Sequence, residues 1–408
     1  MRHALAIWAL LLGSPVQAET SADRFAPRHG LNFEIWTDWL TTEQMVTTPG
    51  FLDQYPDWRH NASPEGIAAL APMGFDFVRL PMDPAPLLRL GPGPRQDALI
   101  AQIVEGAALV QSTGLKVIVD MHSIPRAGES WGTDSIVSDA ALFAALVALV
   151  GKVATALNGM DPDRTALEVL NEPTGDCDAI AQGAGPMTWP DQLTRLYRAA
   201  RSAAPDLPLI LSGACWGGVP GLTVVDPARF DANVLWSFHS YDPFLFTHQA
   251  ALWSAGPNAH FSGLPYPPET IDDALAARLV AEAVARAVAA GATDMTPEVL
   301  AKAMADYRRA GRDAVGAEVA EAAAWAARHG IPQGRLILGE FGAMRGDFQG
   351  VRFNTSARDA FLEDKRRAAE TAGIGWAVWV WTGSFGVAED DARRALAPGT
   401  CAALGLTC

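Results

Sequence analysis

The sequence predicts an α/β fold, a (β/α)8 TIM barrel with a long helical insertion between strands six and seven. Short apolar, β-branched runs alternate with Ala-rich helical stretches, which is typical of a parallel sheet covered by helices. Eight such units can be counted in the 408 residues, the number that a closed barrel requires. An open doubly wound sheet is the alternative, but no Gly-x-Gly-x-x-Gly motif follows the first strand.

The predicted strands are short and are separated by helical segments. They cover Gly30–Phe33, Phe75–Leu80, Lys116–Met121, Ala166–Leu170, Leu209–Ser212, Val234–Phe238, Leu336–Leu338 and Trp376–Val380. The clearest predicted helices are Ser63–Met73, Ala98–Ser112, Asp139–Leu157 and Ser356–Ala372. The first of these begins with Ser-Pro-Glu, in which the serine can cap the helix and the proline suits its first turn.

One connection is far longer than the others. Roughly 90 residues, 243–333, separate strands six and seven. An aromatic, Pro-rich loop over Phe244–Pro268 is followed by Ala-rich helical stretches from Ile271 to Arg328. We interpret this region as an elaborated sixth helix, and a lid or groove wall is the alternative. Because no linker or internal repeat is visible, we expect residues 19–408 to form one domain.

Composition narrows the range of partners. The chain is 49% hydrophobic, which excludes disorder as a description of the whole. Its formal net charge of −15 disfavours nucleic acid and anionic membrane surfaces as partners. A neutral, soluble substrate fits this charge better.

The first 18 residues have the pattern of a secretory signal peptide. A polar start with Arg2 and His3 precedes the apolar run Ala4–Leu12, and Val16-Gln17-Ala18 offers small residues for cleavage after Ala18. Nine apolar residues are too few to cross a membrane, which takes about 20. No later stretch is expected to span one. The predicted location is therefore secreted or periplasmic.

Export permits disulfide bonds, and the chain has four cysteines. Cys401 and Cys408 close a short loop at the C-terminus, whereas Cys177 and Cys215 follow two different predicted strands. We predict the pairs 401–408 and 177–215. Metal binding is the competing interpretation, but no Cys-x-x-Cys spacing or clustered histidine supports it.

Polar and aromatic side chains follow the predicted strands, at the ends that converge on the mouth of a barrel. In chain order they are Arg79, Asp120, His122, Asn171, Glu172, His239, Tyr241, Glu340 and Trp381. Singly, each has an ordinary explanation, such as an ion pair between Arg79 and Glu172. Burying so many polar groups in one cavity is unfavourable unless function retains them.

Glu172 and Glu340 follow strands four and seven, so they are expected to face each other across the mouth. Two carboxyl groups about 5–5.5 Å apart are what glycoside hydrolysis with retention requires. One must donate a proton while the other stays ionised. Arg79 and Tyr241 could stabilise an ionised Glu340, and Asn171 could reach a sugar hydroxyl.

Together these motifs resemble glycoside hydrolase family 5, the cellulase-like retaining enzymes. The resemblance spans Gly30 to Trp381 and rests on Arg79, His122, Asn171-Glu172-Pro173, His239-x-Tyr241, Gly339-Glu340-Phe341-Gly342 and Trp381. The start of the chain, Gly30-Leu31-Asn32-Phe33 with Trp36, also resembles that family's first strand. The insertion after Asp242 departs from the compact members.

The resemblance implies a role for each of these positions. Glu172 would be the general acid/base and Glu340 the nucleophile, supported by Arg79 and Tyr241. The remaining expected substrate-binding residues are His122, Asn171, His239, Trp36 and Trp381. Of these, His239 would lie beside the acid/base and Trp381 would stack on the sugar at the cleavage point.

Tryptophans in predicted loops favour a neutral β-glucan, because flat sugar faces pack on indoles. They are Trp36, Trp39, Trp131, Trp216 and Trp253. We expect a monomeric endo-β-1,4-glucanase that acts on soluble or nascent glucan without a cofactor or metal. The alternatives are a β-mannanase, a β-1,3-glucanase, an exopolysaccharide-specific glycosidase, a metal-dependent barrel hydrolase, and a sugar-binding protein with an inactive site.

Overall fold

The structure is a computed structural model that describes residues 19–33, 64–123, 132–185, 187–254, 256–345, 347–348, 351–389 and 395–408. The predicted signal peptide and Trp36, Trp39 and Trp131 lie outside these residues.

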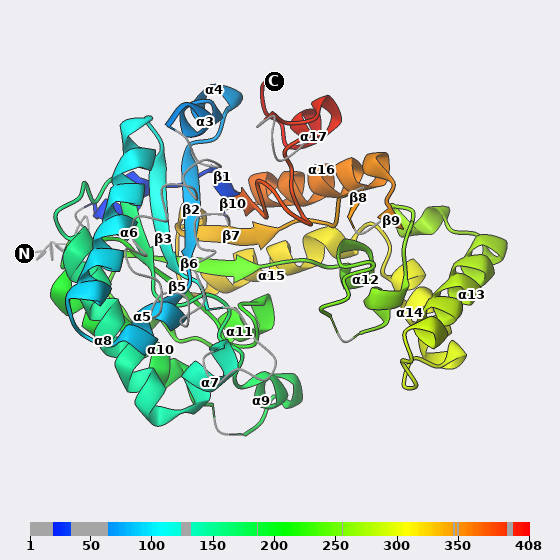
Figure 1. The fold of residues 1–408 in the computed structure, drawn as a ribbon, viewed down its shortest axis with the longest axis horizontal. Helices are drawn as coiled ribbons and strands as arrows, with labels where there is room; N and C mark the ends of the chain where they lie inside the picture. Colours follow the sequence, from blue (N-terminus) through cyan, green and yellow to red (C-terminus); the bar gives the residue numbers. More distant parts are fainter. Residues whose placement is uncertain are drawn as a thin grey trace, which may run out of the picture.

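Eight parallel strands close into a barrel, which confirms the predicted fold class (Figure 1). Around the barrel the order is β1-β10-β7-β6-β5-β4-β3-β2. The strands are β1 (His29–Asn32), β2 (Phe77–Met82), β3 (Lys116–Met121), β4 (Thr165–Glu168), β5 (Leu209–Ser212), β6 (Val234–His239), β7 (Leu336–Phe341) and β10 (Gly375–Val378). β3 and β5 have the predicted bounds, whereas β7 runs on to Phe341 and β10 stops at Val378.

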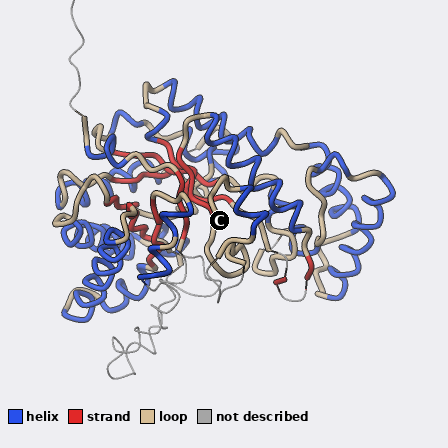
Figure 2. Tube along the Cα trace, turned by 90° about the horizontal axis from the view of Figure 1, so that it is seen from above, coloured by secondary structure: helices blue, strands red, loops and turns tan. Residues whose placement is uncertain are grey.

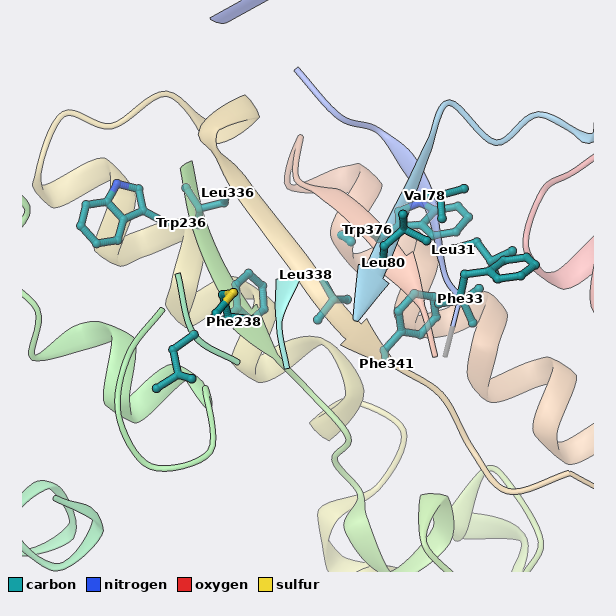
Figure 3. Close-up of a cluster of buried hydrophobic side chains, with 14 of the residues drawn as sticks. Leu31, Phe33, Val78, Leu80, Trp236, Phe238, Leu336, Leu338, Phe341 and Trp376 are labelled. Atoms are coloured by element: carbon teal, nitrogen blue, oxygen red, sulfur yellow. The ribbon is translucent and has the colours of Figure 1, made fainter. Parts of the chain in front are cut away.

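Side chains alternate between the two faces of each strand, which gives the barrel an inner and an outer core. The inner layer near the bottom is apolar and consists of Phe25, Phe77, Ile118, Ala166, Ile210, Leu235, Ile337 and Ala377, with Ala22 beside them. Phe25 comes from the short helix α1 (Ser21–Phe25), which therefore plugs the N-terminal end of the barrel. Outward-facing residues such as Val78, Leu80 and Phe238 belong to the larger core under the helices (Figure 3).

Helices surround the barrel, and some lie beside it or in its connecting loops. After α1, the described helices are α3 (Pro64–Ala68), α4 (Leu70–Met73), α5 (Pro84–Leu90), α6 (Pro94–Ser112), α7 (Thr133–Ser138), α8 (Ala140–Leu157), α9 (Cys177–Gln182), α10 (Trp189–Ala203), α11 (Val219–Thr223), α12 (Phe244–Thr247), α13 (Asp273–Ala289), α14 (Pro297–Ala310), α15 (Ala314–Arg328), α16 (Thr355–Thr371) and α17 (Pro398–Ala403). A small antiparallel pair, β8 (Asp347–Phe348) and β9 (Val351–Arg352), follows β7.

Helix α8 corrects one expectation from the sequence. By length and composition it is apolar enough to cross a membrane, although no such stretch was expected after the leader. In the structure it packs against α10 and buries Phe143, Leu146, Val150 and Val153. Asp139, predicted as its first residue, instead caps it by accepting hydrogen bonds from two backbone N–H groups. α8 is thus part of the helical ring of the barrel.

The long connection between β6 and β7 contains α12 to α15. α15 packs against β7 and α16 and so takes the place of the sixth barrel helix, as the simpler interpretation expected. α13 and α14 pack on each other and project to the side of the barrel (Figures 1 and 2). The insertion therefore adds a helical hairpin beside the barrel.

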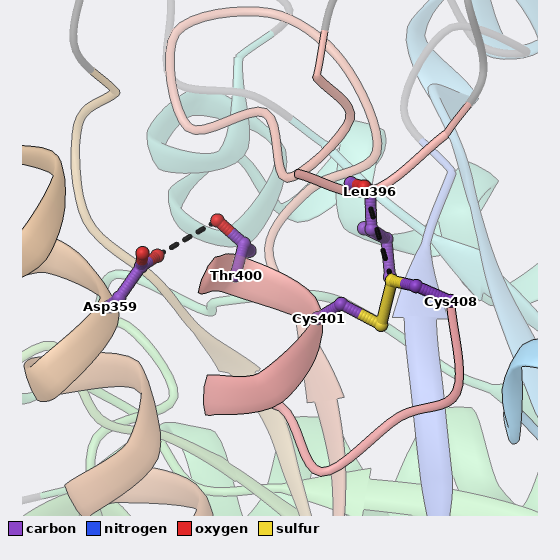
Figure 4. Close-up of a disulfide and its surroundings, with 5 residues drawn as sticks. All are labelled: Asp359, Leu396, Thr400, Cys401 and Cys408. Carbon is purple, nitrogen blue, oxygen red and sulfur yellow. Dashed lines mark hydrogen bonds between the residues drawn. A yellow bond between two sulfur atoms is a disulfide. The ribbon is translucent and has the colours of Figure 1, made fainter. Parts of the chain in front are cut away.

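Both predicted disulfides are present. Cys177 pairs with Cys215, which joins the segments that follow β4 and β5 close to the barrel mouth. Cys401 pairs with Cys408 and closes the C-terminal loop, where Thr400 also donates a hydrogen bond to Asp359 of α16 (Figure 4).

Candidate active site

Arg79 lies in the middle of β2 and is completely buried. Its guanidinium donates four hydrogen bonds of 2.7–2.9 Å and forms a further ion pair at 2.9 Å. The acceptors are Glu168, Asn32, Glu340 and Asn171, and the further ion-pair partner is Asp120. Burial alone would lower the pKa of Arg79, but the surrounding carboxylates raise it well above its ordinary value. Arg79 is a permanent positive charge around which the site is organised.

Glu340 lies near the end of β7 and is 4% exposed. Arg79 Nη1 donates to its Oε1 over 2.8 Å, and the Tyr241 hydroxyl donates to its Oε2 over 2.9 Å. These donors stabilise a carboxylate in its ionised form and fix both of its oxygens. The arrangement confirms that Arg79 and Tyr241 contact this carboxylate, as the sequence led us to expect.

Glu172 follows β4 and lies at the same end of the barrel as Glu340. Its backbone has φ +42°, a left-handed conformation that non-glycine residues adopt mainly at functional sites and turns. Its side chain is 22% exposed, and its Oε1 lies 2.7 Å from His239 Nδ1. The contact places His239 beside Glu172, where it was expected.

The two glutamates have different surroundings. Burial raises the pKa of Glu172 to about 7, although the charges of His122 and Arg79 act to lower it. Burial also lowers the pKa of His239 to about 4, so this histidine is neutral at pH 7 and supplies no cation to Glu172. Glu340 in contrast has the guanidinium of Arg79 directly against it. The two carboxyl groups therefore lie in different electrostatic environments.

Ligand atoms of Glu172, His239 and Glu340 all lie within 4.8 Å of one another. Such a group is compact enough to hold a cation. Glu340, however, already accepts hydrogen bonds from Arg79 and Tyr241, so a metal ion would have to compete with an adjacent guanidinium. The donor set is better suited to proton transfer between carboxyl groups and a substrate.

A chain of hydrogen bonds holds Asn171 and His122. Because Asn171 Oδ1 accepts from Arg79, its Nδ2 must be the atom that lies 3.3 Å from His122 Nε2. His122 Nε2 is then the acceptor, and its Nδ1 donates to Asp120 Oδ2 over 2.7 Å. Asp120 also pairs with Arg79, which closes the ring of contacts. Burial raises the pKa of Asp120 to about 7, while Arg79 acts to lower it.

Asn32 and Glu168 are parts of this network that were not identified from the sequence as site residues. Both are buried and contact Arg79 directly. Asp120 was recognised as a strand-end carboxylate but was given no role. Glu168 could have been found from the sequence, because it is a charged residue within the otherwise uncharged strand β4.

The structure corrects the assignment of Trp381 as the sugar-stacking residue. Trp381 is 2% exposed and stacks on Phe33 within the core, so it has no free face for a ligand. Trp379 is half-buried and stacks on His122, with ring centroids 5.3 Å apart. Of Trp379 and Trp381, it is thus Trp379 that lies against the polar network.

Two further aromatic residues from the loops are exposed. Trp216 follows β5 and is 45% exposed, and Trp253 lies in the insertion and is 57% exposed. Trp216 is anchored next to the Cys177–Cys215 bond, and its backbone N–H donates to the carbonyl of Pro173, directly after Glu172. An exposed indole is therefore anchored close in space to the backbone beside one of the two site carboxylates.

Comparison with known proteins agrees with this geometry. The family model "Cellulase (glycosyl hydrolase family 5)" matches residues 39–384. Endoglucanase 3 of Fibrobacter succinogenes is 26% identical over 227 residues, which are 55% of this chain and 30% of that protein. Cellodextrinase A of Ruminococcus flavefaciens is 27% identical over 189 residues, 46% of this chain and 54% of that protein. The matches thus span only part of both relatives.

Solved structures share the barrel. Thermotoga maritima Cel5A in complex with cellobiose has a TM-score of 0.63 at 20% identity, over 94% of this chain and 99% of that one. The structure of the same protein in complex with mannotriose has a TM-score of 0.62 at 19% identity, over 94% of this chain and 99% of that one. These likenesses support the fold, and the family model spans most of the sequence, including both glutamates of the site. The chain therefore belongs to glycosyl hydrolase family 5.

Proposed function

We propose that this protein is a retaining glycoside hydrolase that cleaves β-1,4-glucan chains internally. The observation that carries the proposal is the close pair of Glu172 and Glu340, with carboxyl oxygens within 4.8 Å of each other. Retaining enzymes have carboxyl groups about 5–5.5 Å apart, whereas inverting enzymes need about 6.5–9.5 Å to admit a water molecule. The short separation favours attack by a carboxylate.

In the first step, ionised Glu340 attacks the anomeric carbon while protonated Glu172 gives its proton to the leaving glycosidic oxygen. The bond to the leaving sugar breaks and a covalent glycosyl ester forms on Glu340. In the second step, Glu172 accepts a proton from water, which displaces Glu340 and restores both carboxyl groups. The anomeric carbon is inverted in each of the two steps, so the product keeps the β configuration of the substrate.

The neighbouring residues prepare the two carboxyl groups for these steps. Arg79 and Tyr241 hold Glu340 in its ionised form and aim it at the substrate. Burial keeps a proton on Glu172 up to about neutral pH. Asn171 and His122 are oriented by the ring of contacts around Arg79, so they can donate to and accept from sugar hydroxyls.

The substrate proposal rests on the aromatic residues and on the relatives. Trp379, Trp216 and Trp253 offer indole faces of the kind on which pyranose rings pack. The relatives named above are an endoglucanase and a cellodextrinase. β-Mannan is a second candidate, because T. maritima Cel5A has been solved with mannotriose.

We also propose that the protein is exported and acts as a monomer of one catalytic domain, residues 19–408. The leader pattern over residues 1–18 and the two disulfides support export, since such bonds persist in oxidising compartments.

The test is a panel of carboxymethylcellulose, mixed-linkage glucan, β-1,3-glucan and β-mannan, with reducing-end release and product length measured. Early release of long oligosaccharides from the β-1,4-linked glucans is expected, and proton NMR of the first products should show the β anomer. Glu340→Gln should abolish hydrolysis, whereas the control Glu363→Gln on the outer face of α16 should not change it. Initial release of the α anomer would refute the retaining mechanism, and preferential cleavage of mannan would refute the proposed substrate.

A further inference from the structure

A buried polar cluster lies behind the active site, on the outer side of the barrel wall. It consists of Ser240, Lys365 of α16 and Glu318 of α15. Lys365 is completely buried, and its Nζ donates to Ser240 Oγ over 2.6 Å. The Ser240 hydroxyl in turn donates to Glu318 Oε2. One hydroxyl thus joins a buried ammonium group to a carboxylate.

Burying a lysine is unfavourable, and the chemistry proposed above does not use Lys365. Burial lowers the pKa of Lys365 to about 8, and the charges of Glu318 and Asp242 oppose this shift. The ring of Phe361 lies 5.8 Å from its Nζ. An apolar side chain at position 365 would pack in the core without this cost, so we expect the buried ammonium group to have a role other than packing.

The position of Ser240 indicates this role, because it stands between His239 and Tyr241 in the chain. His239 contacts Glu172 over 2.7 Å, and Tyr241 contacts Glu340 over 2.9 Å. Side chains alternate along an extended segment, so these two point into the barrel mouth while Ser240 points out to the helices. Any shift of the Ser240 backbone would move both contacts.

The backbone at this point is irregular and needs support. The register of β6 and β7 shifts between Phe238 and His239, so that Gly339 is the extra residue of a bulge. Bulges of this kind re-aim side chains next to active sites. Beyond the bulge, the N–H of Ser240 donates to the carbonyl of Glu340 over 3.1 Å. Ser240 therefore binds the backbone of Glu340 on one side and the two helices on the other.

We propose that Lys365 and Glu318, acting through the Ser240 hydroxyl, are positioning residues that set the distance of Tyr241 and His239 from the two site glutamates. Neither Lys365 nor Glu318 touches the substrate. The test of this proposal by kcat rests on the proposed hydrolase function. Its test by the distance between Tyr241 and Glu340 rests on the structure alone.

The direct test is Ser240→Ala, which removes the link and leaves both charges in place. On an aryl β-cellobioside, kcat should fall at least about tenfold while KM stays within about twofold, because misplacing a catalytic contact affects the transition state. Ser240→Thr should restore most of kcat, since it restores the hydroxyl. The matched control is Ser21→Ala, which removes a buried hydroxyl that accepts from Arg24 at the opposite end of the barrel.

A double-mutant cycle tests whether Lys365 acts through Ser240. If it does, Ser240→Ala combined with Lys365→Met should lower kcat no further than the more damaging single change. Thermal unfolding of each variant separates this effect from loss of folded protein. Multiplicative losses, or an unchanged kcat in Ser240→Ala, would overturn the proposal.

A crystal structure of Ser240→Ala gives a readout that does not depend on turnover. The Tyr241 hydroxyl and Glu340 Oε2, 2.9 Å apart in the wild type, should separate beyond 3.5 Å. An unchanged distance would refute the positioning role even if the wild-type enzyme hydrolysed none of the tested glycosides. Failure of the wild type alone would instead count against the proposed function.

Discussion

Raising the pH through 7 should remove the proton that Glu172 gives to the leaving oxygen. Burial raises the pKa of this carboxyl group to about 7, so its protonated form is the main species below that pH and is lost above it. The acid form is required in the first chemical step. Activity is therefore expected to fall on the alkaline side of neutrality.

The size of the fall follows from the titration of one group. With a pKa of about 7, Glu172 is about nine-tenths protonated at pH 6 and about one-tenth protonated at pH 8. kcat/KM should therefore decrease about tenfold over these two pH units, because it reports ionisations of the free enzyme. His239, with a pKa of about 4, is neutral throughout this range and does not contribute.

The assay is kcat/KM against pH at constant ionic strength on a soluble β-1,4-glucan. Asp120 also has a pKa of about 7, so the two groups must be separated. A 2,4-dinitrophenyl β-cellobioside needs no acid to release its leaving group, and kcat/KM for it reports glycosylation alone. With this substrate, kcat/KM of Glu172→Gln should not fall between pH 6 and pH 8. A fall that persists in Glu172→Gln, or a wild-type kcat/KM that falls to half only above pH 8.5, would refute Glu172 as the group that titrates.

The remaining predictions concern the supporting residues. Tyr241→Phe removes the hydroxyl donated to Glu340, and since a hydrogen bond to a charged group contributes about 1.5–3 kcal/mol, kcat/KM should fall about 10- to 100-fold. Trp379→Ala should raise KM about two- to tenfold without a large loss of stability, because it removes a ring contact worth about 0.5–1.5 kcal/mol. Trp381→Ala should instead lower the free energy of unfolding by about 3–5 kcal/mol, because this side chain is buried.

Each of these predictions has a control. Tyr197→Phe, at the outer surface of α10, should leave kcat/KM unchanged, and an equal loss there would show that the assay reports general damage. For the two tryptophan variants, KM from steady-state kinetics and the free energy of unfolding from denaturant titration are measured on both, so that each serves as the control for the other. A raised KM in Trp381→Ala with normal stability would reverse the roles given to Trp379 and Trp381.

The strands and the polar residues at their ends were predictable because both follow from local sequence. Buried parallel strands need continuous apolar runs, and a charged residue directly after such a run has few structural uses. Arg79, Glu172 and Glu340 were identified in this way, and the structure brings them together at one end of the barrel. The two disulfides were predictable because Cys401 and Cys408 are close enough in the chain to close a short loop, which leaves Cys177 and Cys215 as the other pair.

The choice between Trp379 and Trp381 was not predictable for a geometric reason. The expected last strand ran to Val380, whereas β10 ends at Val378. Beyond a strand the strict alternation of faces is lost, so sequence does not tell which of two nearby indoles points to the mouth. Two partners of Arg79, Glu168 and Asn32, were missed for a different reason, since they come from strands far apart in the chain and only the closed barrel brings them to Arg79.

Trapping the glycosyl-enzyme intermediate would show whether Glu340 forms a covalent bond to the sugar. Incubation with 2,4-dinitrophenyl 2-deoxy-2-fluoro-β-cellobioside, followed by intact-mass measurement and peptide mapping, would locate the adduct. We predict one fluorocellobiosyl group per chain, on the peptide that contains Glu340. An adduct on the peptide with Glu172 would make Glu172 the nucleophile, and turnover with inversion and no adduct would exclude a covalent intermediate; either result would refute the role proposed for Glu340.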